Sequence, residues 1–275
     1  MVSERRSLSF LIIDAIAFWL RHQAVFWLLA LPIAGLAAAV AYTLDSSQQL
    51  NFHRYRWGWE LFYALIYAMF LDRWIKESLL DGATACEEVD DLRRAMVPAR
   101  LLLLAIVFSC FAMALGWLQL QGIAATLVRW GAPDWLMVIG ATVLAWLPHL
   151  LVWATCLAFL AFVVPSWSSG APLSLRRAWQ LSGPARSRIF RLVVGAAFLS
   201  LLTYAVTEWG LEVLPHKAWA TAAMEGSQRL ADCLLLAITG HVLAALYRAL
   251  TNWEPPEPEE RPFRGMRLRP PAVSR

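Results

Sequence analysis

The sequence predicts an all-α membrane protein, a polytopic bundle of six transmembrane helices with short amphipathic helices at one membrane surface. Charged residues make up only 16% of the 275-residue chain and the mean hydropathy is +0.53, whereas about a quarter of a soluble domain is charged. Uncharged segments long enough to cross a bilayer core of about 30 Å recur along the chain. Lysine and arginine concentrate in alternate connections between these segments, so the net charge of +4 indicates orientation across a membrane rather than nucleic-acid binding.

Residues 7–21 predict a first amphipathic helix. Ser7, Asp14 and Arg21 recur every seven residues and form a narrow polar stripe on an otherwise apolar helix. A basic start followed by an apolar run is also typical of a secretory signal peptide. Because Asp14 interrupts the run and Arg21 and His22 stand where small residues should form a cleavage site, we expect the segment to stay in the mature chain.

Residues 24–44 predict the first span, because 21 consecutive residues carry no charge. Pro32 is tolerated inside a transmembrane helix, where neighbouring helices can satisfy the freed carbonyl. Ala30, Ala34 and Ala38 form a small-xxx-small face that predicts close packing on another helix.

The second span is predicted over 57–80, and its last nine residues are rich in charge. Helical spacing pairs Asp72 with Lys76 and Arg73 with Glu77. Two interpretations are open. The charges form an extension that leaves the membrane, or Asp72 or Arg73 lies in a buried polar site.

A polar segment follows and predicts another amphipathic helix, which starts at a capping box formed by Thr84 and Glu87. Its acidic residues favour packing on protein rather than on anionic lipid. Apolar residues then predict a third span over 100–121 and a fourth over 135–164. The fourth segment is apolar for 30 residues, so we expect it to tilt or to kink at Pro148.

The last two spans are predicted at 189–209 and 230–250, with a partly amphipathic outer segment between them. The proline-rich tail, residues 254–275, is expected to be disordered, so that residues 1–253 form a single domain. Six spans place both termini on one side, and that side holds 19 of the lysines and arginines against five on the other. The positive-inside rule predicts that both termini are cytoplasmic.

Amphipathic helices are predicted to begin near residues 8, 85 and 174, and each precedes a pair of spans. One hypothesis is that the chain contains three copies of a unit made of a surface helix and a helical hairpin, arranged about an axis normal to the membrane. The alternative is that short loops simply carry amphipathic helices.

The third amphipathic helix follows Ser174, a suitable N-cap, and ends at Gly183 and Pro184. Apolar residues gather on one side of its wheel and basic residues on the other, a pattern typical of helices that lie in the membrane interface. The surrounding basic segment predicts a site for anionic phospholipid headgroups; alternatively, its arginines only orient the chain during insertion. The predicted headgroup-binding residues are Arg176, Arg177, Arg186, Arg188, Arg191 and Trp179.

Motifs of soluble enzymes are absent from the sequence, and its four cysteines show no paired spacing, so we predict no cofactor and no metal site. Pro148 and His149 fall near the middle of the fourth span, where an ionisable side chain suggests function. The competing interpretation is a neutral imidazole bonded to a carbonyl that Pro148 frees. Asp232 and His241 are nine residues apart on the last span, which places them on opposite sides of the helix, so we expect that they do not face each other. We also expect Asp232 to be solvated near the outer boundary.

The run SLRRAWQLSGPARSRIFRL, a short Ala-Trp helix with a polar break and a basic entry into the next span, resembles a recurrent pattern of bacterial inner-membrane proteins. That group includes the membrane domain attached to some glycerophosphodiester phosphodiesterases and many stand-alone six-span proteins. FLDRWIKESLLDG resembles a second recurrent segment of the same group. The resemblance implies a six-span protein of the bacterial inner membrane. It carries over no catalytic residues, because the phosphodiesterase activity belongs to a separate soluble domain.

These features favour a non-enzymatic inner-membrane protein, a scaffold or lipid-associated factor whose partners are membrane lipids, anionic phospholipid in particular. The alternative is a small-solute transporter or channel that uses a polar site near Pro148 and His149. An intramembrane polar site could also include Asp72 and Arg73 at the end of the second span.

Overall fold

The computed structural model describes residues 7–47, 52–80, 161–169, 173–213 and 218–252, together with the single residues 129, 155 and 158. All regular elements within these ranges are helices, which confirms the all-α class. Several predictions lie outside the described residues: the helix that starts at Thr84, the spans at 100–121 and most of 135–164, Pro148 and His149, and the tail at 254–275.

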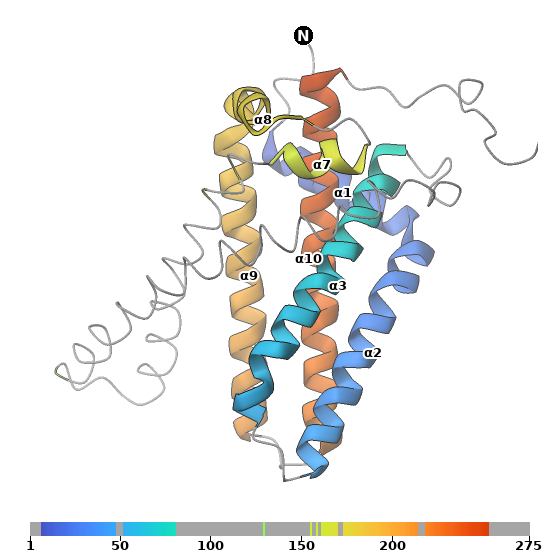
Figure 1. Ribbon diagram of the computed structural model, residues 1–275, viewed down its shortest axis with the longest axis vertical. Coiled ribbons are helices and arrows are strands. Elements are labelled where there is room, and N and C mark those ends of the chain that lie inside the picture. The colour runs from blue at the N-terminus through green and yellow to red at the C-terminus, as the bar shows by residue number, and fades with distance from the viewer. Residues whose placement is uncertain are drawn as a thin grey trace, which may run out of the picture.

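Four long helices form the body of the described structure, and shorter helices gather at one end of it (Figure 1). The chain alternates in direction through the long helices, and α10 contacts α1, α2, α3, α7 and α9. In chain order the helices are α1 (Leu8–Arg21), α2 (Gln23–Ser47), α3 (Phe52–Leu80), α7 (Val163–Ser168), α8 (Leu175–Ser182), a 3-10 turn (Gly183–Ala185), α9 (Arg186–Val213) and α10 (Ala218–Thr251).

Three helical segments in the described ranges are long and apolar enough to cross a membrane: Gln23–Thr43, Leu175–Tyr204 and Ala218–Thr251. They coincide with the first, fifth and sixth predicted spans, and they are consistent with a membrane protein. The predicted second span forms the long helix α3, which packs beside α2 and α10. A total of six spans and the threefold repeat stay predictions.

Both amphipathic helices that the structure describes begin at a serine cap, which was predicted for Ser174 and which the structure adds for Ser7. The Ser7 hydroxyl oxygen accepts a hydrogen bond from the Phe10 N–H at 3.3 Å, and the Ser174 oxygen accepts one from the Arg177 N–H at 3.4 Å. Leu11, Ala15 and Phe18 bury one face of α1 against the bundle. The N-terminal segment is therefore a helix packed on the long helices rather than a helix lying apart from them.

Helix α10 corrects the prediction that the last span starts at residue 230, because it begins 12 residues earlier, at Ala218. Residues 218–229, between the observed and the predicted start of the helix, include alanines and no proline, so nothing interrupts the helical hydrogen bonds. Its inward positions, Ala220, Gly226 and Gln228, are buried. The segment predicted to be an outer connection thus forms the first turns of the central helix.

Near the end that carries α1, α7 and α8, hydrogen bonds from two side chains fix α3 against α10. The fully buried Trp74 donates its indole N–H to the carbonyl oxygen of Ala237 at 2.8 Å. Arg248 donates to the carbonyl oxygens of Ser78 and Leu79, at 3.2 and 3.4 Å, and so caps the last turn of α3. These contacts join the end of α3 to the C-terminal half of α10.

Candidate functional site

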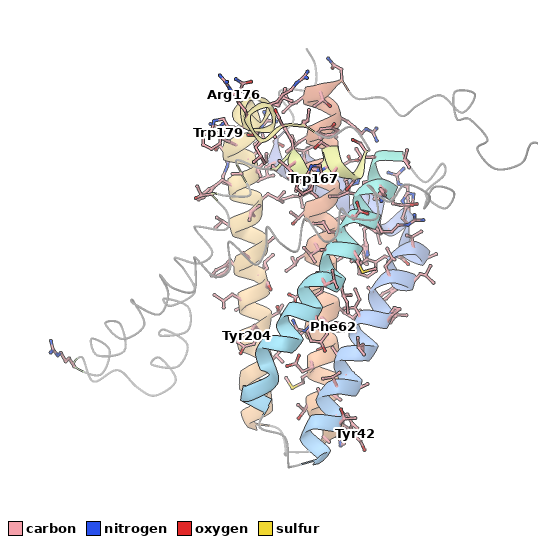
Figure 2. The ribbon with its side chains drawn as sticks, in the orientation of Figure 1. Tyr42, Phe62, Trp167, Arg176, Trp179 and Tyr204 are labelled. Carbon is pink, nitrogen blue, oxygen red and sulfur yellow. The ribbon has the colours of Figure 1, made fainter. Side chains whose placement is uncertain are left out.

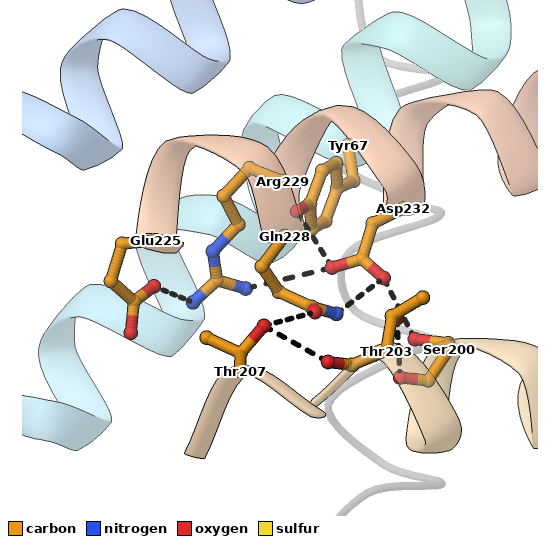
Figure 3. Close-up of polar contacts among 8 residues, drawn as sticks. All are labelled: Tyr67, Ser200, Thr203, Thr207, Glu225, Gln228, Arg229 and Asp232. Atoms are coloured by element: carbon orange, nitrogen blue, oxygen red, sulfur yellow. Dashed lines mark hydrogen bonds and ion pairs between the residues drawn. The ribbon is translucent and has the colours of Figure 1, made fainter. Parts of the chain in front are cut away.

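A polar cluster lies inside the bundle, where the middles of α3, α9 and α10 meet (Figure 3). We call it the central polar cluster. Its position makes it the leading candidate for a site, because polar groups at membrane depth are costly unless they are paired or functional. Its members are Tyr67 from α3, Ser200, Thr203 and Thr207 from α9, and Glu225, Gln228, Arg229 and Asp232 from α10.

Asp232 is the acceptor at the centre of this cluster. Its Oδ1 accepts hydrogen bonds from the Ser200 hydroxyl at 2.7 Å and from the Gln228 amide at 3.3 Å. Its Oδ2 accepts one from the Tyr67 hydroxyl at 3.2 Å. The Asp232 side chain is 16% exposed, so the prediction that it is solvated near the outer boundary was wrong. The reason is the early start of α10, which places Asp232 well inside the helix rather than one turn from its end.

Arg229 lies between two carboxylates. Its guanidinium nitrogens are 3.8 Å from Oε2 of Glu225 and 4.0 Å from Oδ2 of Asp232. Both distances exceed the 2.7 to 2.9 Å that is usual for a charge-assisted hydrogen bond. The guanidinium carbon lies 4.4 Å from the centre of the Tyr63 ring, so the cation stacks on an aromatic face. One cation is therefore shared by two carboxylates, although neither holds it closely.

Gln228 links Asp232 to α9. Its amide nitrogen donates to Asp232, while its side-chain oxygen lies 3.3 Å from the Thr207 hydroxyl, which is also 2.9 Å from the carbonyl of Thr203. Gln228 and Thr207 are both buried. The donors around Asp232 suit an ionised carboxylate, and the hydroxyl and amide groups can reorient if a cation or a proton reaches it.

Sequence reasoning missed this cluster, although a signal for it existed. Four polar residues of α10, Glu225, Gln228, Arg229 and Asp232, stand at i, i+3, i+4 and i+7, the spacing of a single helical face. The prediction of an outer connection hid the pattern, because only a continuous helix aligns these residues. Asp232 and His241 do not share a site, as predicted, since His241 lies beside Asp14 of α1.

Asp72, predicted either to leave the membrane or to occupy a buried polar site, is buried. Its carboxylate accepts hydrogen bonds from the Ser168 hydroxyl of α7 and from the Lys76 ammonium, both at 2.7 Å. The predicted pairing of Asp72 with Lys76 is confirmed. Arg73 is half-buried on the same turn of α3. The Asp72 site ties α3 to α7, and it is separate from the central polar cluster.

The predicted headgroup-binding residues lie on and after α8, at the end of the bundle that also carries α1 and α7 (Figures 1 and 2). Arg176, Arg177 and Arg191 are exposed, and Arg188 is half-buried. Arg186 donates to the carbonyl of Trp179 at 2.7 Å and lies 4.8 Å from the centre of its ring. Arg186 therefore positions Trp179, and three of the five arginines present exposed side chains.

The fold and these sites describe a helical protein with segments long and apolar enough to span a membrane and with polar groups buried between its helices. Within the described ranges, no group of three or more histidine, cysteine, aspartate or glutamate side chains is placed to hold a metal ion. No protein-family model matches the chain, and no curated protein or solved structure shows significant similarity to it.

Proposed function

We propose that the protein is a non-enzymatic, multi-pass protein of the bacterial inner membrane, a scaffold or lipid-associated factor that binds anionic phospholipid at its cytoplasmic rim. The observation that carries this proposal is the division of α8 into three sectors. Ala178 and Ser182 are buried against the bundle, Leu175 and Trp179 are 58% and 48% exposed, and the polar side carries the arginines. A helix with these sectors suits a position at the edge of a bundle, with lipid beside it and headgroups above it.

The orientation of α8 supports an interfacial position. Figure 1 shows α8 end-on above the vertical α9, so α8 runs across the axis of the long helices. Trp167 and Trp179 lie at this end of the bundle, while the half-exposed Tyr42 lies at the opposite end (Figure 2). Aromatic residues at both ends are typical of the two interfaces of a membrane protein.

Electrostatics supply the affinity in this proposal. A basic residue close to an anionic membrane surface contributes about 1 kcal/mol, and the effect decays within a Debye length. Arg176, Arg177 and Arg191 lie on α8 and the first two turns of α9, at one end of the bundle. Their combined attraction for phosphate oxygens is about 3 kcal/mol on this basis. The fixed Trp179 ring adds apolar contact at acyl-chain depth.

The cytoplasmic assignment of this rim follows from charge. In the six-span scheme the connections on this side, together with both termini, hold 19 lysines and arginines. The directions of the described helices fit this scheme. Helix α2 runs away from the end of the bundle that carries α8, and α3 and α10 run back toward that end.

A triple substitution tests the proposal. Replacing Arg176, Arg177 and Arg191 with glutamine should leave insertion unchanged and reduce the anionic phospholipid that is extracted with the purified protein. The matched control replaces Arg261, Arg264 and Arg267, which removes the same charge from the tail. Equal lipid content in the two variants would leave the arginines with a purely topological role.

Small-solute transport is the second candidate function, and the central polar cluster favours it. The cluster, rather than Pro148 and His149, provides the described polar site at mid-bundle, and Asp232 is its acceptor. Proton uptake into proteoliposomes that contain a pH-sensitive dye tests this function. If the wild type transports protons, the Asp232→Asn variant does not and the Asp72→Asn variant still does, the transporter function would replace the scaffold proposal. Absence of proton flux in the wild type would support the scaffold proposal.

A further inference from the structure

The ring of Phe18 in α1 lies between two imidazoles. The centre of the His22 ring is 4.0 Å from that of Phe18 with an interplanar angle of 21°, and the centre of the His241 ring is 4.3 Å away at 27°. Each histidine in turn lies near a carboxylate from another helix, His22 near Glu77 of α3 and His241 near Asp14 of α1. We call these five residues the Phe18 junction; they connect α1 to α3 and α10.

His22 has a defined tautomer when it is neutral. Its Nδ1 is 3.0 Å from the carbonyl oxygen of Phe18, and because a carbonyl only accepts hydrogen bonds, Nδ1 carries the proton. Its Nε2, which lies 4.0 Å from Oε1 of the buried Glu77, is then a bare lone pair facing a carboxylate. A second proton on Nε2 would convert this contact into an attractive ion pair.

His241 is buried with an exposed fraction of only 8%, and neither of its ring nitrogens has a hydrogen-bond partner. A buried polar group without a partner is destabilising. Its Nε2 lies 3.6 Å from Oδ2 of Asp14, beyond the length of a charge-assisted hydrogen bond. A small inward movement of α1 would close this gap, and the imidazolium form would supply both the donor and the charge.

Each imidazole of the junction faces its own set of charges. At His241, the negative Asp14 of α1 attracts an imidazolium, whereas Arg21 of α1 and Arg248 of α10 repel it. At His22, the carboxylate is Glu77 of α3. Histidine is the side chain whose charge normally changes between pH 5 and 8. The junction therefore sets one carboxylate against each of its two imidazoles.

We propose that the Phe18 junction is a proton-dependent latch that holds α1 on the bundle. Each imidazole takes up one proton, and the two histidine–carboxylate contacts become ion pairs that draw α1 toward α3 and α10. When the imidazoles lose these protons, the ion pairs are lost, and the contacts that remain to hold α1 within the described part of the chain are apolar ones. This inference goes beyond the proposed lipid binding, and it does not depend on it.

The side of α1 that faces away from the bundle is apolar and exposed. Phe10, Ile13, Ile16 and Leu20 are all at least 40% exposed, so α1 is apolar on two sides and already suited to contact lipid. Because α1 lies at the same end as α8, the latch would let acidity on that side of the membrane alter the arrangement of this rim.

Hydrogen exchange of the full-length protein in lipid nanodiscs tests the latch. After correction for the intrinsic effect of pH on exchange, the α1 amides should exchange about tenfold more slowly at pH 5.5 than at pH 8, as expected for one added charge-assisted bond or more. The amides of α2 provide the internal reference and should show a ratio near one. An α1 ratio equal to that of α2 in the wild type would overturn the proposal.

Variants identify the groups responsible. The double variant His22→Gln and His241→Gln should lose the pH dependence of α1, and Asp14→Asn, at a side chain that is 41% exposed, should reduce it. Glu225→Gln, on α10 but in the central polar cluster, should retain it. If the double variant loses α2 protection as well, Asp14→Asn decides the result. Persistence of the full ratio in Asp14→Asn and in the folded double variant would contradict the latch.

Discussion

Gly226 of α10 packs directly against the backbone of Ala34 in α2. A Cβ atom at position 226 would lie 3.3 Å from the Ala34 carbonyl oxygen and 3.3 Å from Cβ of Ala38. The two helices approach this closely because both faces consist of small residues, as the spacing of Ala30, Ala34 and Ala38 predicts. Close packing of this kind gives dispersion contacts that do not depend on the hydrophobic effect, which is absent between helices in lipid.

A large side chain at position 226 should separate α2 from α10. Gly226→Leu is expected to lower stability by about 3 kcal/mol, because a backbone carbonyl cannot move aside as a side chain can. The control is Gly35→Leu in α2, where a Cβ would meet no atom within 4 Å. Thermal unfolding of the two purified variants measures the difference. Equal melting temperatures would contradict the packing of α2 on α10.

The indole N–H of Trp74 should contribute to stability in addition to the packing of the aromatic ring. Trp74→Phe keeps an aromatic group but removes the donor to the Ala237 carbonyl, and we expect a loss of about 1 to 2 kcal/mol. Trp27→Phe is the matched control, since Trp27 is 39% exposed. Chemical unfolding in mild detergent measures both. A Trp74 variant as stable as the Trp27 variant would show that the hydrogen bond contributes nothing.

Removing the Asp232 carboxylate, the acceptor of the central polar cluster, should lower the free energy of unfolding. Asp232→Leu leaves the Tyr67 and Ser200 hydroxyls without their acceptor and Arg229 with one carboxylate fewer, so we expect a loss of about 3 to 5 kcal/mol. Glu225→Gln, where the side chain is 27% exposed, should cost less than about 1 kcal/mol. Unfolding curves of both variants make the comparison. The reverse order would show that Glu225, and not Asp232, is the principal partner of Arg229.

Local sequence signals were sufficient for several elements. The uncharged run that starts at residue 24 predicts α2, the seven-residue polar stripe predicts α1, and the cap at Ser174 with its apolar periodicity predicts α8. These features depend on residues within a few turns of one another, so a single sequence reveals them. The burial of Asp72 depends on Ser168 of α7, which lies 96 residues away in the chain.

The central polar cluster and the Phe18 junction could not be predicted in the same way. Tyr67 and Asp232 are 165 residues apart in the chain, and His241 meets Asp14 from the opposite end of the sequence. Such pairs depend on which helices become neighbours, and helix periodicity does not determine that. The early start of α10 was hidden for a related reason, because Arg229 and Asp232 looked exposed until their partners on α3 and α9 were known.

Topology reporters test the six-span arrangement. Fusions after Leu50, Pro133 and His216 should report the periplasm, and fusions after Asp91, Ser169 and Arg261 the cytoplasm, because the excess of lysine and arginine lies on the second set of segments. Alkaline phosphatase and green fluorescent protein fusions give opposite signals on the two sides. One reversed internal site would contradict six spans, and the long fourth segment is where such a reversal is most expected.

Affinity for anionic phospholipid tests the central claim most directly. Delipidated protein is titrated with phosphatidylglycerol or phosphatidylcholine, and bound lipid is counted by native mass spectrometry at low and high ionic strength. We expect phosphatidylglycerol to bind the wild type and the tail variant (Arg261, Arg264 and Arg267 to glutamine) in a salt-dependent manner, with affinity lower by on the order of 100-fold when Arg176, Arg177 and Arg191 are replaced. Equal affinity of all three proteins, or equal binding of the two lipids by the wild type, would contradict a headgroup site at α8.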